Sequence, residues 1–302
     1  MTSNAEAVAA TNRHYDLPPE LFAAFLGHRM KYTCGLYPDA TATLDEAQDA
    51  KLEFIARCLR ASGAGGEGGG YGGQAVLDVG TGWGSLAFFL AERSGCRVTA
   101  VTPSSTQAGY VRDRAASSGL DERVHVIERS VYDLDLPAAS FDAVALVGVI
   151  EHMPDHRRVL AAAARLLRRG GRLYLSASCF RCQAAFDEYT TAPASRHVLQ
   201  TVFGYGTLRP LSALVQAAEE AGLSVTGITD LTPHYHRTIE DWLARIAAAR
   251  GRIDAIVPGY SGELTRYLEA TNAGWGHTAK HYALCAVRSR WGCAEISREV
   301  PR

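Results

Sequence analysis

The chain has 302 residues, of which 47% are hydrophobic and 21% are charged, so it can bury a large core without metals or disulfides. Its formal net charge of −1 gives no surface field that would attract a polyanion, which argues against nucleic acid as a partner. The N-terminus has no signal-peptide pattern, and no apolar run approaches the ~20 residues that span a bilayer. We therefore expect a cytoplasmic protein without stable membrane insertion.

The N-terminal part of the chain is expected to form a unit of its own. Residues 1–62 are predicted as a helical cap over the functional site. Glycine dominates residues 63–73, which predicts a flexible linker, because glycine loses the most conformational freedom on ordering. Residues 74–290 are predicted as the main domain, and residues 291–302 as a C-terminal tail.

Apolar β-branched runs alternate with helical periods through the main domain. Such repeated units predict an α/β fold with a doubly wound, mostly parallel seven-stranded sheet and right-handed crossovers. The expected strands are 75–79, 97–101, 124–128, 141–147, 172–176, 223–230 and 281–287, with helices at 104–118, 155–169 and 211–221 and two more before the last strand. Gly170 and Gly171 are expected to end the helix before the fifth strand, and residues 177–210 are expected to form a lid insertion after it.

A glycine-rich turn follows the first expected strand. It reads DVGTGWG over residues 78–84 and opens a helix, which is the context that gives a glycine fingerprint meaning. Doubly wound sheets bind ligands at the carboxyl ends of their strands, where Gly80, Thr102 and Val147 are expected to converge. A dinucleotide site is the rival interpretation, but the spacing is not GxGxxG. The second strand also lacks an acidic residue for a ribose hydroxyl. The third interpretation of the glycine-rich turn is a tight turn that binds no ligand.

Short segments on both sides of this turn match one known family in the same order. They are HYDL (14–17), MKYTCGLY (30–37), TLDEAQ (43–48), TPSSTQ (102–107), VGVIEH (147–152) and HYHRTIEDW (234–242). On these motifs the chain resembles the cyclopropane-fatty-acid and mycolic acid cyclopropane synthases. That family belongs to the class I methyltransferases, which have a Rossmann-like fold and bind S-adenosylmethionine. Each motif is weak alone, but together they cover nearly the whole chain.

The resemblance implies a set of cofactor-binding residues. Tyr32 and Thr33 would contact the methionine part of S-adenosylmethionine from one side, and Gly80 and Gly82 from the other. The remaining implied positions are Asp78 in the turn, Thr102 and Gln107 along the ribose, Val147 at a strand end, and Ser130 and Val131 at the adenine. The family often has an acidic residue and an aromatic one at this adenine position.

The same resemblance implies catalytic residues around a bound bicarbonate, at Cys34 (through its backbone), Glu151 and Tyr235. A fourth family position, a histidine, falls on Ser176, which brings no imidazole, so plain methyl transfer is favoured over bicarbonate-dependent ring closure. Glu151 can stabilise positive charge on an acceptor, whereas its structural alternative is an acid at the start of the next helix. His152 joins Glu151 in amine methyltransferases similar to this family.

We therefore expect an enzyme that methylates carbon, in an alkene or an electron-rich ring, of a small lipophilic acceptor in specialised metabolism. The alternatives are a cyclopropane synthase on unsaturated acyl chains, a small-molecule amine N-methyltransferase, and a silent binding protein that keeps the cofactor fold. The product would be S-adenosylhomocysteine. A homodimer is left open. Cys179 and Cys182 alone have ligand-like spacing, and without a second ligand pair we expect no metal site. Trp242 and Trp275 fit core packing.

Overall fold

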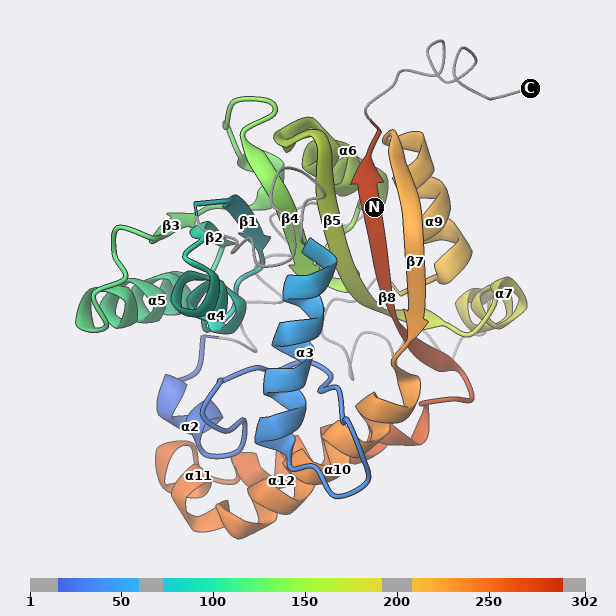
Figure 1. Ribbon diagram of the computed structural model, residues 1–302. Helices are drawn as coiled ribbons and strands as arrows, with labels where there is room; N and C mark the ends of the chain where they lie inside the picture. Colours follow the sequence, from blue (N-terminus) through green and yellow to red (C-terminus); the bar gives the residue numbers. More distant parts are fainter. Residues whose placement is uncertain (1–15, 60–72, 192–207, 290–302) are drawn as a thin grey trace.

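A mixed, mostly parallel β-sheet forms the centre of the computed structural model, which describes residues 16–59, 73–191 and 208–289 (Figure 1). Its strands are β1 (Ala75–Val79), β2 (Arg97–Thr102), β3 (Val124–Glu128), β4 (Phe141–Val147), β5 (Leu167–Phe180), β6 (Arg209–Pro210), β7 (Leu223–Asp230) and β8 (Ala279–Arg288). The order is β3-β2-β1-β4-β5-β8-β7, with the two-residue β6 paired to β5 outside this path. Strand β8 runs antiparallel to β5 and β7. The predicted fold class is confirmed.

Helices cover both faces of the sheet and close one end of it. They are α2 (Pro19–Ala23), α3 (Leu44–Leu59), α4 (Ser85–Ser94), α5 (Ser105–Ser117), α6 (His156–Leu166), α7 (Gln183–Thr191), α9 (Leu211–Glu220), α10 (Thr232–Ala248), α11 (Arg250–Ile256) and α12 (Tyr260–Ala273), with short 3-10 turns η1 (Val131–Asp133) and η2 (Ile150–His152). Helices α3, α4 and α5 pack on one face, and α6 and α9 on the other. Helices α2, α10, α11 and α12 build a third apolar cluster below the sheet in Figure 1.

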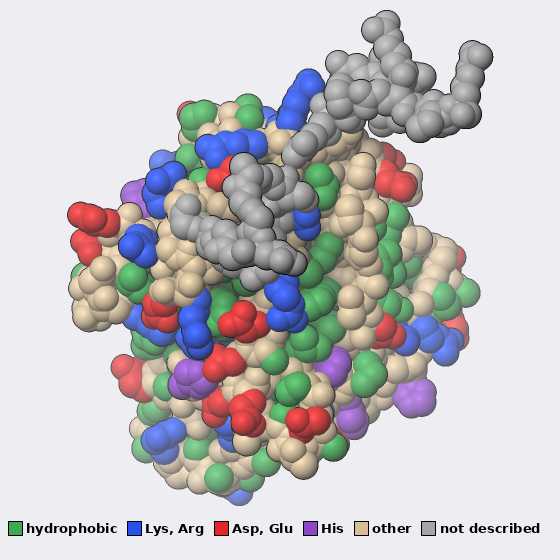
Figure 2. All heavy atoms as spheres, viewed as in Figure 1, with side chains coloured by type: hydrophobic (Ala, Val, Ile, Leu, Met, Phe, Trp, Pro, Cys, Tyr) green, Lys and Arg blue, Asp and Glu red, His purple; other side chains and the backbone are tan. Residues whose placement is uncertain are grey.

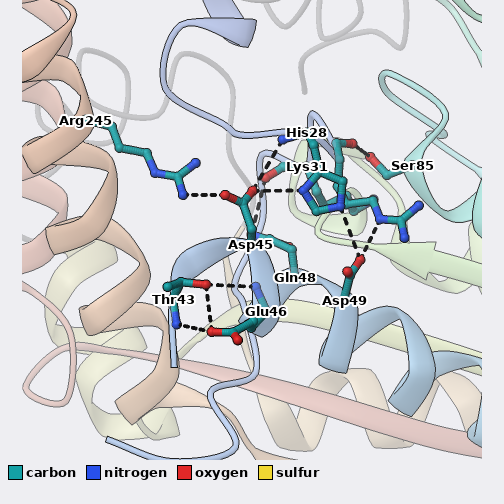
Figure 3. Close-up of polar contacts among 10 residues, drawn as sticks. His28, Lys31, Thr43, Asp45, Glu46, Gln48, Asp49, Ser85 and Arg245 are labelled. Carbon is teal, nitrogen blue, oxygen red and sulfur yellow. Dashed lines mark hydrogen bonds and ion pairs between the residues drawn. The ribbon is translucent and has the colours of Figure 1, made fainter. Parts of the chain in front are cut away.

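Hydrogen bonds and ion pairs of the first turn of α3 connect the N-terminal segment to α10. Thr43 and Glu46 form a capping box there, in which the Glu46 carboxylate accepts from the Thr43 N–H at 2.8 Å. Asp45 then accepts from His28 and, at 2.7 Å, from the Arg245 guanidinium of α10 (Figure 3). These contacts place residues 30–33 at the end of the sheet.

The fifth strand differs from its prediction at both ends. Helix α6 stops at Leu166, and β5 begins at the next residue, so Gly170 and Gly171 do not cap a helix. Gly170 has φ 78° inside the strand, next to a register shift against β4, so these glycines form a bulge. At its other end β5 continues to Phe180, because the segment pairs with β8.

Three helices, not two, separate β7 from β8. The predicted lid insertion begins within β5, continues as α7 and ends at β6, while residues 192–207 lie outside the described part. So do His14 and Tyr15, residues 60–72 of the predicted linker and cap, and the predicted tail. The domain boundaries stay predictions.

Charges of both signs are interspersed on the face drawn in Figure 2, without a field of one sign. Among the described residues, Ile228 of β7 is the one large hydrophobic side chain that is strongly exposed. No helix in the described ranges has the length and apolar character needed to cross a membrane.

Candidate functional site

A cavity opens at the carboxyl ends of β1, β2 and β4, and it holds about 960 Å³ of space, open solvent included. Of the predicted cofactor residues, those that line it are Tyr32, Thr33, Gly80, Gly82, Thr102, Gln107, Ser130, Val131 and Val147. We call it the first cavity. The sequence motifs, far apart in the chain, thus meet around one space.

The glycine turn forms one wall of the first cavity. Gly80 and Gly82 both have positive φ, 71° and 57°, which favours glycine. A Cβ added at Gly82 would meet nothing within 4 Å, so it would project into open space. Asp78, by contrast, does not line the cavity. It is fully buried and accepts from the Thr81 hydroxyl at 2.7 Å, which fixes the shape of the turn.

A buried polar network supports the opposite wall. The Lys51 ammonium of α3 donates to the Thr33 hydroxyl at 3.0 Å, and the Gln48 amide donates to the Thr33 carbonyl at 2.9 Å. Burial lowers the pKa of both Lys51 and Lys31, and the Asp78 carboxylate opposes this effect at Lys31. Lys31 lines the first cavity, a role that the sequence analysis did not assign although the residue lies within a matching motif.

The ends of β2 and β3 supply the rest of the wall. The Thr102 hydroxyl donates to the Gln107 side chain at 2.8 Å, which orients both groups along the cavity. Ser104 caps α5 by accepting from the Gln107 N–H. Ser130 precedes η1, and the nearby Tyr132 and Arg129 also line the cavity.

A second cavity adjoins the first and holds about 620 Å³, again with open solvent included. The two cavities share Tyr32, Thr33, Gly148 and His152 as lining residues. A Cβ added at Gly148 would come within 2.6 Å of the Thr33 side chain, so the absence of one lets the two walls approach. Ligands in the two cavities would therefore meet at this common wall.

Several aromatic rings line the second cavity. Tyr235 of α10 stacks on Trp275, with 4.5 Å between ring centroids, and lies edge-on to Trp242 at 6.2 Å. Tyr32 lies edge-on to Trp242 at 5.0 Å. Trp242 and Trp275 thus line the second cavity in addition to the core packing that the sequence indicated. Such rings favour an apolar ligand and can stabilise positive charge on it.

Glu151 is the buried carboxylate of the second cavity, and it is 8% exposed. Its Oε1 accepts from the backbone N–H of Ser178 at 2.9 Å. Burial raises the pKa of Glu151, while His152 and the hydrogen bonds of Ser178 work in the opposite direction. The N-cap of α6 is Asp155 and not Glu151, because the Asp155 carboxylate accepts from the Arg158 N–H at 3.0 Å.

Some predicted positions lie elsewhere. The Cys34 side chain is buried beneath the cavities and donates to the Gly35 carbonyl, and burial raises the pKa of this thiol to about 12. Only its backbone stays a candidate. Ser176 is buried and is not among the described residues that line either cavity. Ser178, two residues further along β5, contacts Glu151 instead.

The two histidines next to Tyr235 in the sequence, His234 and His236, have contacts away from the two cavities. His234 stacks against Tyr37, and His236 pairs with Glu240 on the surface. The sequence analysis missed one histidine at the site, His281 of β8, which is 1% exposed and lies against Tyr235. Within the described residues, no group of three or more His, Cys, Asp or Glu side chains is placed to hold a metal ion.

Comparisons with known proteins agree with the predicted resemblance. The model of the family described as mycolic acid cyclopropane synthetase matches residues 2–282. Tuberculostearic acid methyltransferase UfaA1 of Mycobacterium tuberculosis is 31% identical over 248 residues, which cover 78% of this chain and 54% of the relative. Cyclopropane mycolic acid synthase 1 of the same species is 28% identical over 256 residues, covering 82% and 85%.

The fold also matches a solved structure of mycolic acid cyclopropane synthase CmaA1 in complex with SAH (S-adenosylhomocysteine) and CTAB. The TM-score is 0.79 at 23% identity, with 95% of this chain and 99% of the other covered. The chain spans about half the length of several curated relatives, 53% and 54% of two mycobacterial proteins and 62% of one from Pseudomonas putida. Because the family model matches most of the sequence, the chain belongs to the mycolic acid cyclopropane synthetase family.

Proposed function

We propose that this protein is an S-adenosylmethionine-dependent methyltransferase that methylates an electron-rich carbon of a lipophilic acceptor. The observation that carries the proposal is the wall that the two cavities share at Tyr32, Thr33, Gly148 and His152. A cofactor in the first cavity and an apolar acceptor in the second would have their reacting atoms next to each other at this wall.

The residues of the first cavity fit the cofactor. The open space over Gly82 leaves room for a ligand against the backbone. The Oδ1 atom of Asp78 is buried beneath the turn without a hydrogen-bond partner in the described part of the chain, and its carboxylate would favour a positively charged ligand in the first cavity. Family membership and the S-adenosylhomocysteine complex of CmaA1 support the same assignment.

When bound, S-adenosylmethionine supplies an electrophilic methyl group, so the protein chiefly has to align the acceptor and exclude water. Orientation of this kind can lower a barrier by roughly 7–11 kcal/mol. The rings of Tyr235, Trp242 and Trp275 hold the acceptor and stabilise the positive charge that develops on it. Glu151 adds a full negative charge and accepts, directly or through a bound base, the proton that the acceptor loses.

Product analysis tests this proposal. Wild-type protein is incubated with S-adenosylmethionine that bears a deuterated methyl group, and with oleic acid, dioleoyl phosphatidylglycerol vesicles, indole and a secondary amine in separate reactions. We expect label on a carbon of an alkene or ring, incorporated far more slowly when Glu151 is replaced by glutamine. Label on the amine alone would favour the N-methyltransferase alternative. Binding of the cofactor without any transfer would favour a silent binding protein.

Bicarbonate is expected to have little influence on the rate, because the sequence position of the family's histidine holds Ser176. Turnover in bicarbonate-depleted buffer should stay close to that in supplemented buffer. Proton NMR of the product should show a new methyl group and no methylene bridge. High-field cyclopropane protons, together with a rate that collapses without bicarbonate, would instead identify a ring-closing enzyme.

The rate is also expected to fall on acidification. Burial raises the pKa of Glu151, and only the ionised carboxylate can stabilise positive charge or accept a proton. Turnover should therefore decline as the pH falls through a value above the ordinary range of glutamate. A pH–rate profile measured at saturating S-adenosylmethionine checks this, and a flat acid limb would contradict it.

A further inference from the structure

Behind Glu151 lies a polar chain that the reaction described above does not use. It runs from Glu151 in η2 to Ser178 of β5, and from Ser178 to His281 of β8. The Ser178 N–H donates to Glu151 Oε1 at 2.9 Å, and the Ser178 hydroxyl lies 3.3 Å from His281 Nδ1. Ser178 and His281 are direct partners in the antiparallel β5–β8 pair, which fixes their side chains next to each other.

His281 is held through both its backbone and its ring. Its backbone N–H donates to the Thr232 hydroxyl at 3.1 Å, and its carbonyl accepts from Leu231 at 2.8 Å, at the start of α10. The ring lies edge-on to Tyr235, with 4.7 Å between centroids. It is not among the described residues that line the second cavity. An acceptor therefore contacts Tyr235 and Glu151, while His281 supports both of them.

We propose that His281 is a positioning residue for Glu151: its Nδ1–H donates to the Ser178 hydroxyl, so that Ser178 directs both of its own donors at the Glu151 carboxylate. This inference rests on the proposed function. In this arrangement the imidazole is neutral, and Ser178 holds the carboxylate ionised and aimed at the acceptor.

The electrostatics agree with a neutral donor. Burial lowers the pKa of His281 to about 3, and the Lys51 ammonium adds to this effect, so the ring carries one proton through the neutral range. A chain of hydrogen bonds in which each hydroxyl both accepts and donates strengthens every member. The groups that face Glu151 are His152 on its own turn, Cys179 on β5, Tyr235 on α10, Tyr267 on α12 and Tyr32 in the N-terminal segment. Those that face His281 are Tyr235, Lys51 and Asp230, and the Asp230 carboxylate opposes the lowering of the His281 pKa.

The first test measures the ionisation of Glu151 without any acceptor. Carbon-13 NMR of protein labelled at the glutamate carboxyls follows its titration, and the Glu151→Gln spectrum assigns the resonance. His281→Phe keeps a ring but no donor, and Ser178→Ala removes the hydroxyl; both should move the titration to higher pH. His281→Asn keeps an N–H donor near the Nδ1 position and should titrate like the wild type.

The double variant Ser178→Ala/His281→Phe should titrate no higher than Ser178→Ala alone, since the two residues act in series. Nitrogen-15 NMR of histidine-labelled wild type should place the proton of His281 on Nδ1. If the proton lies on Nε2 alone, the hydrogen bond runs the other way and the proposal is wrong. Ser178→Ala and His281→Asn decide the question even if His281→Phe does not fold.

Kinetics provide the second test, on whichever acceptor of the panel above is methylated. Ser178→Ala and His281→Phe should lower kcat about tenfold to a hundredfold with little change in KM, as expected for a misplaced catalytic group. The acid limb of the pH–rate profile should move to higher pH. Tyr282→Phe, on the neighbouring position of β8 with its side chain on the opposite face, is the matched control and should leave both quantities unchanged.

Different results would overturn the positioning role of His281 and the proposed function. An unchanged Glu151 titration in Ser178→Ala and His281→Phe would overturn the positioning role, while a slow Glu151→Gln variant would still support the proposed function. Conversely, a Glu151→Gln variant with wild-type turnover would remove the proposed function, and the NMR titrations would still decide whether His281 controls Glu151.

Discussion

Replacing Glu151 with glutamine is expected to lower kcat about 10²–10³-fold, which corresponds to about 2.7–4 kcal/mol of lost transition-state stabilisation. Glutamine keeps the shape of the side chain and can still accept from the Ser178 N–H, but it has no charge. Glu151 lines the second cavity and not the first, so the affinity for S-adenosylmethionine should stay nearly unchanged. Steady-state kinetics and a binding titration on the same preparation measure the two effects.

Tyr235→Phe serves as the comparison, because it removes one hydroxyl from the same cavity and keeps the ring stacked on Trp275. Its effect on kcat should be smaller than that of Glu151→Gln. If Glu151→Gln lowers the melting temperature by many degrees while turnover per folded molecule stays intact, the carboxylate is structural and its catalytic assignment is wrong.

The second large effect concerns the glycine turn. Wild-type protein should gain about 2.7 kcal/mol of stability from S-adenosylmethionine or S-adenosylhomocysteine at a hundredfold excess over Kd. Gly82→Val should abolish this gain, because its side chain would fill the space that the ligand needs. The backbone φ of 57° at Gly82 is in addition strained for a β-branched residue. The melting temperature with and without ligand is the measurement.

Gly222→Val is a matched control for backbone strain. Gly222 has φ 78° and open space around it, but it lies in the turn between α9 and β7 and not at the first cavity. This variant should be destabilised while the rise in melting temperature with ligand is retained. A Gly82→Val protein that keeps the full ligand-dependent rise would show that the cofactor does not approach this turn.

Local patterns predicted most of the sheet. Strands β1, β3, β4 and β7 have the expected bounds, because each is a short apolar run set off by turn residues. Strand β5 was predicted too short at its C-terminal end because that extension is held by pairing with β8, about 100 residues away in the chain. Glycines within that strand look in sequence like the end of a helix, whereas the structure uses them for a bulge.

The two cavities differ in how far local sequence patterns could predict them. In the first, strand ends predicted Gly80, Thr102 and Val147, and the family resemblance supplied the other predicted residues, such as Tyr32 and Thr33. Lys31 also lines this cavity and was not predicted. The second depends on contacts among β5, β8, α10, α12 and Trp275, which follows α12, and no local period brings these together. Trp242 and Trp275 have helical or apolar contexts typical of core residues, and His281 sits in an ordinary strand. Their roles required the tertiary structure.

Calorimetric titration of the wild-type protein tests the central claim most directly, because it needs no knowledge of the acceptor. S-adenosylmethionine and S-adenosylhomocysteine should each bind at one site, and Gly82→Val should abolish the signal. NAD should give no binding heat. Binding of NAD with equal affinity, or no binding by either sulfur compound, would contradict the assignment of the first cavity and with it the proposed methyl transfer.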